Sequence, residues 1–462
     1  MQRCRSGTQR ALTAIAATLL AGSMVAGCGS DTEAPEGGDE TVSAAGISLP
    51  ETPAGQQVSW FLEASSQPPI PPDEFTERMS PEFLAEISPE VINEVLMAVG
   101  PLEPTEVQSA TDDAIVVSIN SADGQLTLTL RVNDDGMIDT LNLAPALNIP
   151  DAPESWGSLT ERLESLAPEA SFIAARLNDD GACESAHDVR ADDVMPIASM
   201  FKVYVLEAVQ RAIDAGDLTW ESTIAVTEDN RSWPTGFLQD EEPGTEVTVA
   251  EAAGLMISFS DNTASDMLLE AVGREAVEEV VAETSANADA NRPMLTTQEM
   301  FKLKIVDYPQ LADQFSGGGE AERRSLLNTT VADTPLPELA AAEPWTSSRH
   351  IDSIGWFGSA SDMCAAFGSL HEIGDENVAA AMSDNDGGVA LGAEWTSVWY
   401  KGGSEPGVTA LGYLAENDAD ETYVVVVLTN APDTDVPEME ESEARITEMM
   451  SLARGAFTLM TN

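Results

Sequence analysis

The residues of this chain with the clearest chemical potential form a Ser-x-x-Lys pattern at positions 199–202. The apolar run 203–209 follows, and the helical pattern ends at Gly216. A serine and a lysine three positions apart at the start of a helix lie on one face, one turn apart, and the hydroxyl meets the positive end of the helix dipole. Ser199 is the candidate nucleophile and Lys202 its candidate base, because burial or a neighbouring cation can lower the pKa of a lysine.

A second pattern, Ser260-Asp261-Asn262, follows the apolar run 252–257. The hydroxyl of Ser260 can relay a proton to a leaving group, and the amide of Asn262 can hold a substrate carbonyl. These two side chains are therefore candidates for a place beside the nucleophile.

A third pattern, Lys401-Gly402-Gly403-Ser404, continues the strand-like residues 397–400. Lys401 is a second cation that can depress the pKa of Lys202 and attract a substrate carboxylate. The two glycines let a substrate lie against an edge strand. The backbone N–H of Ser404, together with that of the nucleophile, can form an oxyanion hole.

Lysine is scarce in this chain, which has only Lys202, Lys302, Lys304 and Lys401. A protein that nearly avoids lysine needs a reason for each one that it keeps. Two of the four belong to the patterns above, which favours a chemical role for both.

The elements that must position these groups extend over residues 158–462. A strand at 171–177 is followed by a helix-rich middle, by strands at 397–402, 408–414 and 423–429, and by a helix at about 438–457. Strands at both ends of the segment predict one sheet built from both ends, with a helical subdomain inserted between them.

Residues 51–150 predict a separate, small α+β domain. Ser80-Pro81-Glu82 is typical of a helix start, and an apolar stripe continues to Leu96. Strand-like runs at 114–119, 125–132 and 137–143 are separated by turn sequences and predict an antiparallel meander. No histidine, cysteine or paired polar group in this domain suggests chemistry, so we interpret it as a binding or packing module. The stretch 151–157 is the expected boundary.

Together, the three ordered patterns resemble the signature of class A β-lactamases and penicillin-binding proteins, Ser-x-x-Lys, Ser-Asp-Asn and Lys-Thr/Ser-Gly. The 61 positions that separate Ser199 from Ser260 resemble the class A spacing. The resemblance implies an α/β (α+β) fold of a sheet with a helical subdomain, and an acyl-enzyme mechanism. It also implies the roles that the residue types suggest: nucleophile, base, proton shuttle, amide contact, tuning cation and oxyanion N–H for Ser199, Lys202, Ser260, Asn262, Lys401 and Ser404.

The sequence departs from this family in the deacylation machinery. Class A β-lactamases carry a loop glutamate about 35 residues past Ser-Asp-Asn, which activates the deacylating water. That distance reaches Leu295 to Thr297 here, and residues 296–300 are similar to the helix start after that loop. We therefore expect a shortened loop. The glutamates at 270–283 are interpreted as solvated surface, and Asp289 is the nearest loop acid.

Substrate binding departs from the family as well. Gly402 stands where the family has a hydroxyl residue, and the strand 408–414 lacks the arginine that often binds the β-lactam carboxylate. The sequence predicts a protein that acylates but is poorly equipped to deacylate. A small α+β domain ahead of such a domain also resembles the two-domain β-lactamase-like proteins of the clavulanic acid biosynthesis cluster and their actinobacterial lipoprotein relatives.

The charge balance excludes some partners. Lys and Arg number 21 against 80 Asp and Glu, for a formal net charge of −59. Such a surface repels nucleic acid and anionic lipid head groups. It is interpreted as a solvating acidic shell, with an acidic surface for a cationic partner as the alternative.

The N-terminus predicts export and lipid anchoring. Three arginines precede the apolar run 11–25, which is too short to span a bilayer as a stable helix, and 25–28 resemble the bacterial lipobox. Residues 1–28 are the expected signal with lipobox, Cys28 the lipidated residue, and 29–50 a flexible tether. Cys183 and Cys364 then remain, either as a disulfide or, as we slightly prefer, as two buried small apolar residues.

The sequence therefore predicts a monomeric serine hydrolase, lipid-anchored to the outer face of the bacterial cytoplasmic membrane, that acts on a β-lactam, ester or amide without cofactor or metal. Three scattered histidines, His187, His350 and His371, and the lack of a Gly-x-Ser-x-Gly elbow argue against a Ser-His-Asp triad or a zinc site. The alternatives are a peptidoglycan D,D-peptidase or transpeptidase acting on stem peptides, and a non-turnover penicillin-binding or envelope-sensing module.

Overall fold

The computed structural model describes residues 42–44, 47–110, 114–122, 124–133, 135–178, 180–339, 345, 347–392, 394–432 and 439–461. The signal, Cys28 and most of the tether lie outside these residues. The chain divides into two compact units, 1–147 and 148–462. Within the segment interpreted as a tether, strands β1 (Val42–Ala44) and β2 (Ile47–Leu49) form an antiparallel pair, and Leu49 is buried.

The helices of the N-terminal unit are α2 (Pro53–Ser65), α3 (Pro72–Arg78), α4 (Pro81–Glu86) and α5 (Pro89–Val99). Each begins with a proline, whose missing N–H costs nothing in the first turn. As the sequence predicts, Ser80 caps α4 and accepts a hydrogen bond from the Phe83 N–H. The apolar stripe is not one helix, however, because Ser88-Pro89 ends α4 and starts α5.

The sheet of this unit is antiparallel in the order β3 (Glu103–Ala110), β4 (Ala114–Ser121), β5 (Gly124–Val132) and β6 (Ile138–Pro145). The last three strands are the predicted meander. Alternate side chains, such as Ile115 and Val117 of β4 and Leu128 of β5, are fully buried in a common core with the helices. Strand β3 was not predicted, because its polar sequence shows no apolar alternation.

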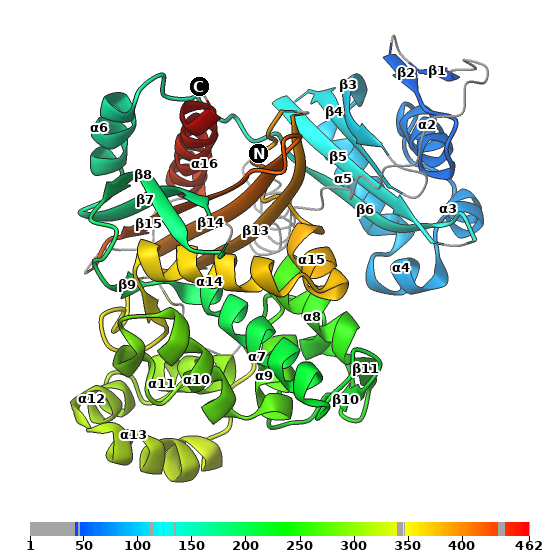
Figure 1. Ribbon diagram of the computed structural model, residues 1–462. Helices are drawn as coiled ribbons and strands as arrows, with labels where there is room; N and C mark the ends of the chain where they lie inside the picture. Colours follow the sequence, from blue (N-terminus) through cyan, green and yellow to red (C-terminus); the bar gives the residue numbers. More distant parts are fainter. Residues whose placement is uncertain are drawn as a thin grey trace, which may run out of the picture. The chain divides into compact units, whose positions relative to one another are not determined.

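The sheet of the second unit has five antiparallel strands in the order β13-β14-β15-β7-β8 (Figure 1). Their bounds are β7 (Glu169–Leu177), β8 (Cys183–Val189), β13 (Trp395–Glu405), β14 (Val408–Asn417) and β15 (Thr422–Asn430). Strands from both ends of the segment thus share one sheet, as predicted. All nine residues of β15 are buried, which explains its continuous apolar sequence.

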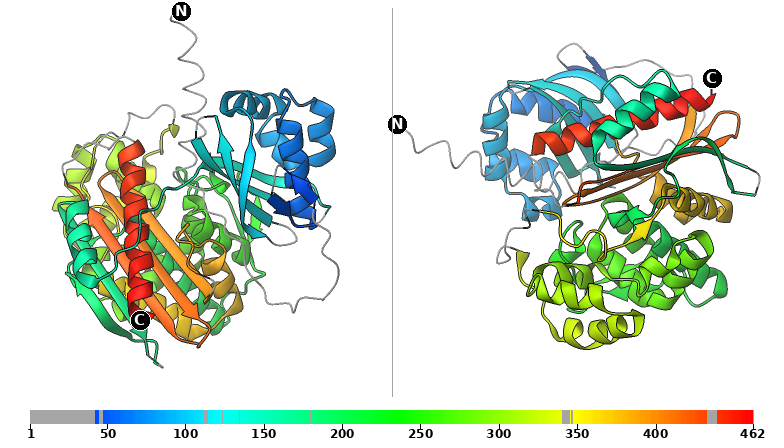
Figure 2. Two further views of the ribbon diagram at one scale, coloured as in Figure 1. Left: turned by 90° about the horizontal axis from the view of Figure 1, so that it is seen from above. Right: turned by 90° about the vertical axis from the view of Figure 1, so that its left-hand side faces the viewer.

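Helices cover both faces of this sheet. Helices α6 (Trp156–Leu166) and α16 (Met439–Thr461) lie on one face, and α14 (Ala360–Ile373) lies on the other (Figure 2). The helical subdomain holds α7 (Lys202–Ala215), α8 (Val249–Ser258), α9 (Asn262–Val272), α10 (Arg274–Thr284), α11 (Thr297–Ile305), α12 (Gln310–Gly317) and α13 (Glu320–Leu326). Helix α15 (Glu376–Ser383) leads back to β13. The α/β (α+β) fold class is therefore confirmed.

Two pairs of short antiparallel strands complete the unit. They are β9 (Met195–Pro196), which pairs with β12 (Phe357–Gly358), and β10 (Thr223–Ala225), which pairs with β11 (Glu246–Thr248). Within the described ranges, no helix is both long and apolar enough to cross a bilayer.

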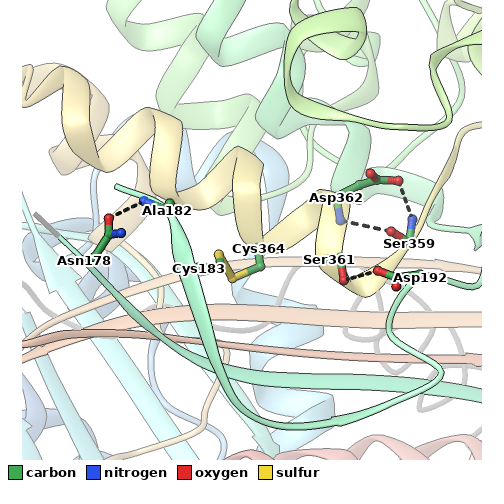
Figure 3. Close-up of a disulfide and its surroundings, with 8 residues drawn as sticks. All are labelled: Asn178, Ala182, Cys183, Asp192, Ser359, Ser361, Asp362 and Cys364. Atoms are coloured by element: carbon green, nitrogen blue, oxygen red, sulfur yellow. Dashed lines mark hydrogen bonds between the residues drawn. A yellow bond between two sulfur atoms is a disulfide. The ribbon is translucent and has the colours of Figure 1, made fainter. Parts of the chain in front are cut away.

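Cys183 and Cys364 form a disulfide, so the preferred interpretation of two unpaired residues is wrong. The bond joins the edge strand β8 to helix α14, across 181 positions of sequence (Figure 3). Cys364 is fully buried, which satisfies the apolar character that suggested the unpaired alternative. Sequence position alone could not pair two residues so far apart.

Candidate active site

Ser199 lies in a short 3₁₀ turn, Ala198–Phe201, that leads into α7. Ala198 has φ +44°, in the left-handed region, so the turn is held in a strained conformation by its surroundings. The ring of Phe201 stacks on Trp356 at 3.9 Å, and the Ile197 N–H donates to the Trp356 carbonyl. Ser199 is half-buried, and among the described residues its hydroxyl has no hydrogen-bond partner.

Lys202 is completely buried in the first turn of α7. Its Nζ donates to Asn262 Oδ1 at 2.8 Å, to Ser260 Oγ at 3.2 Å and to the Ser260 carbonyl at 2.5 Å. All three acceptors are neutral. Burial lowers the pKa of Lys202 to about 7, although the carboxylates of Asp261 and Asp266 oppose the shift. A large share of this amine is therefore neutral near pH 7 and able to accept a proton.

Ser260 lies between the two lysines of the sequence patterns. Its Oγ also accepts a hydrogen bond from Lys401 Nζ at 3.0 Å, and its φ of +54° is again left-handed. Burial and then the charge of Lys202 lower the pKa of Lys401 well below its usual value. A hydroxyl between two amines is well placed to pass a proton between them.

Asp261 has a structural role that the sequence did not reveal. Its buried carboxylate accepts hydrogen bonds from the backbone N–H groups of Ala264, Phe237 and Leu238. It thereby caps α9 and fixes the loop before it, where Gly236 (φ +103°) is required because a Cβ would lie 2.2 Å from this carboxylate. Asn262 follows at once, and its Nδ2 donates to the Trp233 carbonyl. The acid of the pattern thus sets the orientation of the amide.

Lys401, buried at 2 % exposure, lies on β13, which is an edge strand as expected. A Cβ on Gly403 would lie 2.3 Å from the Ile197 carbonyl oxygen and 2.7 Å from the Ser199 nitrogen. Gly403 therefore packs directly against the backbone of the turn that carries Ser199. This contact brings the segment of Ser404 beside Ser199. The N–H of Ser199 lies in the first turn, where backbone N–H groups have no acceptor within the helix.

The three sequence patterns therefore converge on one place. Hydrogen bonds link Lys202, Ser260, Asn262 and Lys401, and Gly403 lies against the backbone of Ser199. The Ser404 side chain is exposed. The histidines lie elsewhere: His187 contacts Thr160, His350 contacts Asp313 and Tyr308, and His371 contacts Glu416. Within the described residues, no cluster of three or more His, Cys, Asp or Glu side chains could hold a metal ion.

Buried polar side chains surround the start of α11, the place where the sequence lacks the glutamate of the family. Helix α11 begins at Thr297, as its sequence suggests, and Thr296 caps it. The Thr297 hydroxyl donates to Ser232 Oγ at 2.7 Å, and the carboxylate of Asp266 accepts the N–H groups of Thr297 and Gln298. Burial raises the pKa of Asp266 to about 7. This carboxyl group is thus occupied in holding the helix start.

The acids considered from sequence are engaged or exposed. Asp289 has a side chain 98 % exposed, with an ion pair to Arg292. Glu278 was interpreted as solvated surface, which is wrong: it is buried, and it accepts hydrogen bonds from the Met294 N–H and the Arg324 guanidinium. Its helix, α10, packs against α7 within the helical subdomain, so the role of Glu278 is structural.

Each of the two units matches a known protein family. Residues 159–453 match the family model described as "Beta-lactamase enzyme family", and residues 49–138 match "ORF 12 gene product N-terminal". No curated protein matches the chain.

Similar solved structures share low identity. They include a β-lactamase from Sphaerobacter thermophilus (19 % identity, 66 % of this chain, 98 % of that chain, TM-score 0.45). PBP-A (18 %, 68 % and 100 %, TM-score 0.42) and a class A β-lactamase described as the last common ancestor of Gram-negative bacteria (18 %, 66 % and 98 %, TM-score 0.44) are further examples. Because the family match covers well over half of its residues, the chain belongs to the beta-lactamase enzyme family.

Proposed function

We propose that this protein is a serine hydrolase that forms an acyl-enzyme on Ser199 with a β-lactam, ester or amide. The observation that carries the proposal is the environment of Lys202: a completely buried amine, one turn from Ser199, with neutral acceptors and a pKa of about 7. Such an amine can act as a base, whereas an ordinary surface lysine cannot.

In the proposed reaction, Ser199 Oγ attacks the carbonyl carbon while its proton passes to Lys202 Nζ. The oxyanion receives hydrogen bonds from the N–H groups of Ser199 and Ser404. The C–N or C–O bond then breaks, and Ser260 passes a proton to the leaving group with the help of the two lysines. Asn262 holds the acyl amide, and water later cleaves the ester bond to Ser199.

Deacylation is proposed to be slow. The stretch where the family carries its glutamate holds Thr297, whose hydroxyl donates a hydrogen bond to Ser232. The carboxylate of Asp266 accepts the Thr297 N–H at the start of α11. Glu299 is also engaged, because it forms an ion pair with Arg274 and accepts a hydrogen bond from the N–H of Thr296, the N-cap of the same helix. A slow step of this kind also supports the alternatives, a peptidoglycan D,D-peptidase or transpeptidase and a non-turnover penicillin-binding module.

Intact-protein mass spectrometry separates these functions. The protein without residues 1–28 is mixed with a chromogenic cephalosporin and, separately, with an activated ester. Turnover with an adduct that decays once the substrate is consumed supports a slowly deacylating hydrolase, and an adduct that persists without turnover supports the non-turnover module. Both signals are expected to vanish in Ser199→Ala and to persist in Ser165→Ala, an exposed serine on α6. Signals that survive Ser199→Ala would refute the proposal, whereas activity on stem peptides alone would favour the peptidase.

We also propose that the protein is exported and lipid-anchored through Cys28. The disulfide between Cys183 and Cys364 supports export, because such bonds persist outside the reducing cytoplasm. We further propose a relation to the two-domain proteins of the clavulanic acid biosynthesis cluster, which rests on the order of a small N-terminal unit, matched over residues 49–138, before a β-lactamase-family unit. Membrane fractionation of wild type and Cys28→Ala tests the anchor: release of the variant into the medium supports it, and unchanged retention contradicts it.

A further inference from the structure

On β13, the side chain of Tyr400 lies beside Gly402. They are two positions apart, so both face the same side of the sheet. A Cβ on Gly402 would lie only 2.1 Å from the Tyr400 hydroxyl oxygen. The tyrosine hydroxyl therefore occupies the space in which a side chain at position 402 would begin.

The ring of Tyr400 is held firmly. A Cβ on Gly387 would lie 2.5 Å from it, and the ring of Tyr413, its cross-strand partner, lies 5.1 Å away. The loop that contains Gly387 is itself fixed, because Asn385 donates to the Ser258 carbonyl and Asp386 accepts the Gly388 N–H. The position of the hydroxyl is thus set by the packing of the ring against Gly387 and Tyr413.

The hydroxyl of Tyr400 is available for a ligand. Tyr400 is partly exposed, and no hydrogen bond joins its hydroxyl to another of the described residues. The loss of water around its hydroxyl and then the charge of Asp386 raise the pKa of Tyr400, so the group is a neutral donor at physiological pH. It stands beside Gly402, whose carbonyl accepts a hydrogen bond from Lys401 Nζ at 2.8 Å.

The surroundings of Gly402 offer little to a carboxylate. The residue opposite Gly402 on β14 is Leu411, an apolar side chain with 3 % exposure. Lys401 donates to Ser260 and to the Gly402 carbonyl, which leaves at most one N–H for a substrate oxygen. The net charge of −59 adds a long-range repulsion of anions at low ionic strength.

We propose that Tyr400 determines substrate specificity: its hydroxyl binds an uncharged oxygen of the acyl donor beside Lys401, so that neutral esters and amides acylate Ser199 faster than free acids. The proposal rests on the proposed function of Ser199. It assigns the hydroxyl of this subsite to position 400 in place of position 402.

A matched substrate pair tests the proposal: a chromogenic cephalosporin as the free acid and as its methyl ester. For the wild type, the acylation rate constant is expected to be at least about tenfold higher for the ester. Tyr400→Phe is expected to lower the ester rate about tenfold, the loss of one hydrogen bond, and to change the free-acid rate much less. Tyr413→Phe is the control, because its buried hydroxyl has no hydrogen-bond partner within the part of the chain that the structure describes, and it is expected to leave both rates unchanged.

The outcomes distinguish the two proposals. A free acid that reacts as fast as the ester, or equal effects of the two tyrosine variants, would overturn the role of Tyr400. Labelling of Ser199 by a fluorophosphonate reports on the nucleophile independently of this subsite. Lack of labelling in the wild type would overturn both proposals, whereas labelling without any effect of Tyr400→Phe would overturn only the second.

Discussion

Lys202 and Lys304 are both completely buried, yet their surroundings differ in one respect. Lys304 Nζ forms an ion pair with Glu405 at 2.5 Å, whereas Lys202 Nζ contacts only neutral oxygens of Ser260 and Asn262. Burial lowers the pKa of both amines and carboxylates oppose both shifts, but only Lys304 is in direct contact with a carboxylate, that of Glu405. A buried lysine with a carboxylate is a structural cation, and one with neutral acceptors is suited to be a base.

The pair of Lys304 and Glu405 also lies close to the site. Glu405 ends β13 directly after Ser404, and Lys304 lies in the last turn of helix α11, so the ion pair joins the motif strand to the helical subdomain. The ring of Trp345 lies 5.6 Å from Lys304 Nζ, and Arg349 donates to the Lys304 carbonyl. Three of the four lysines, Lys202, Lys304 and Lys401, are thus buried around the same strand end.

Replacement of Lys202 should cause the largest loss. Lys202→Met is expected to lower the rate of Ser199 acylation by about 10³-fold, because a positioned general base contributes 10²–10⁴-fold. Lys202→Arg should lose as much, since a guanidinium stays protonated. The measurement is the time course of the covalent adduct by mass spectrometry. An arginine variant within tenfold of the wild type would remove the distinction between the two lysines.

Replacement of Lys304 should instead act on stability. Lys304→Met leaves the buried carboxylate of Glu405 without its partner and is expected to cost about 3–5 kcal/mol of unfolding free energy. Removal of both charges in Lys304→Met/Glu405→Met should recover most of that loss, because no unpaired charge remains. Denaturant titration measures both. If the single and double variants unfold at the same midpoint, Lys304 is not the structural cation described here.

The pH dependence of acylation sharpens the comparison further. Lys202 must be neutral to accept a proton, and its pKa is about 7. The acylation rate is therefore expected to rise with pH, with a limb centred near pH 7 and a fall of about tenfold per unit below it. A stopped-flow profile of the wild type between pH 5 and 9 tests this. A flat profile would show that the amine is not the titrating base.

The sequence indicated the candidate residues that the structure brings together, but not the contacts that support them. Ser199, Lys202, Ser260, Asn262 and Lys401 are found from short patterns, because their chemistry requires fixed residue types at helix starts and on a strand. The ion pair of Lys304 with Glu405 and the disulfide join positions 101 and 181 apart, and no local periodicity encodes such contacts.

Contacts that depend on how neighbouring segments pack could not be predicted from the sequence either. From the sequence, Gly402 was interpreted as a lost hydroxyl and as room for a substrate against an edge strand. Nothing in a sequence shows that Tyr400 fills the space beside it. Likewise, Glu278 has the pattern of a surface acid until the segment that bonds to it, at Met294, is placed. Packing between distant segments decides both cases.

The smallest expected effect concerns the stability cost of the base. The pKa of Lys202 is lowered from its usual value near 10.5 to about 7, so between these values the unfolded chain binds more protons than the folded one. Stability attributable to Lys202 therefore rises with pH across this window and is lowest at and below pH 7. Lys202→Met is expected to raise the unfolding free energy by about 1 kcal/mol at pH 7, with a gain that shrinks towards pH 10. Urea titrations at both pH values measure this gain, and Lys304→Met should show the opposite sign. A Lys202→Met variant less stable than the wild type at pH 7 would mean that this lysine, like Lys304, is retained for the fold.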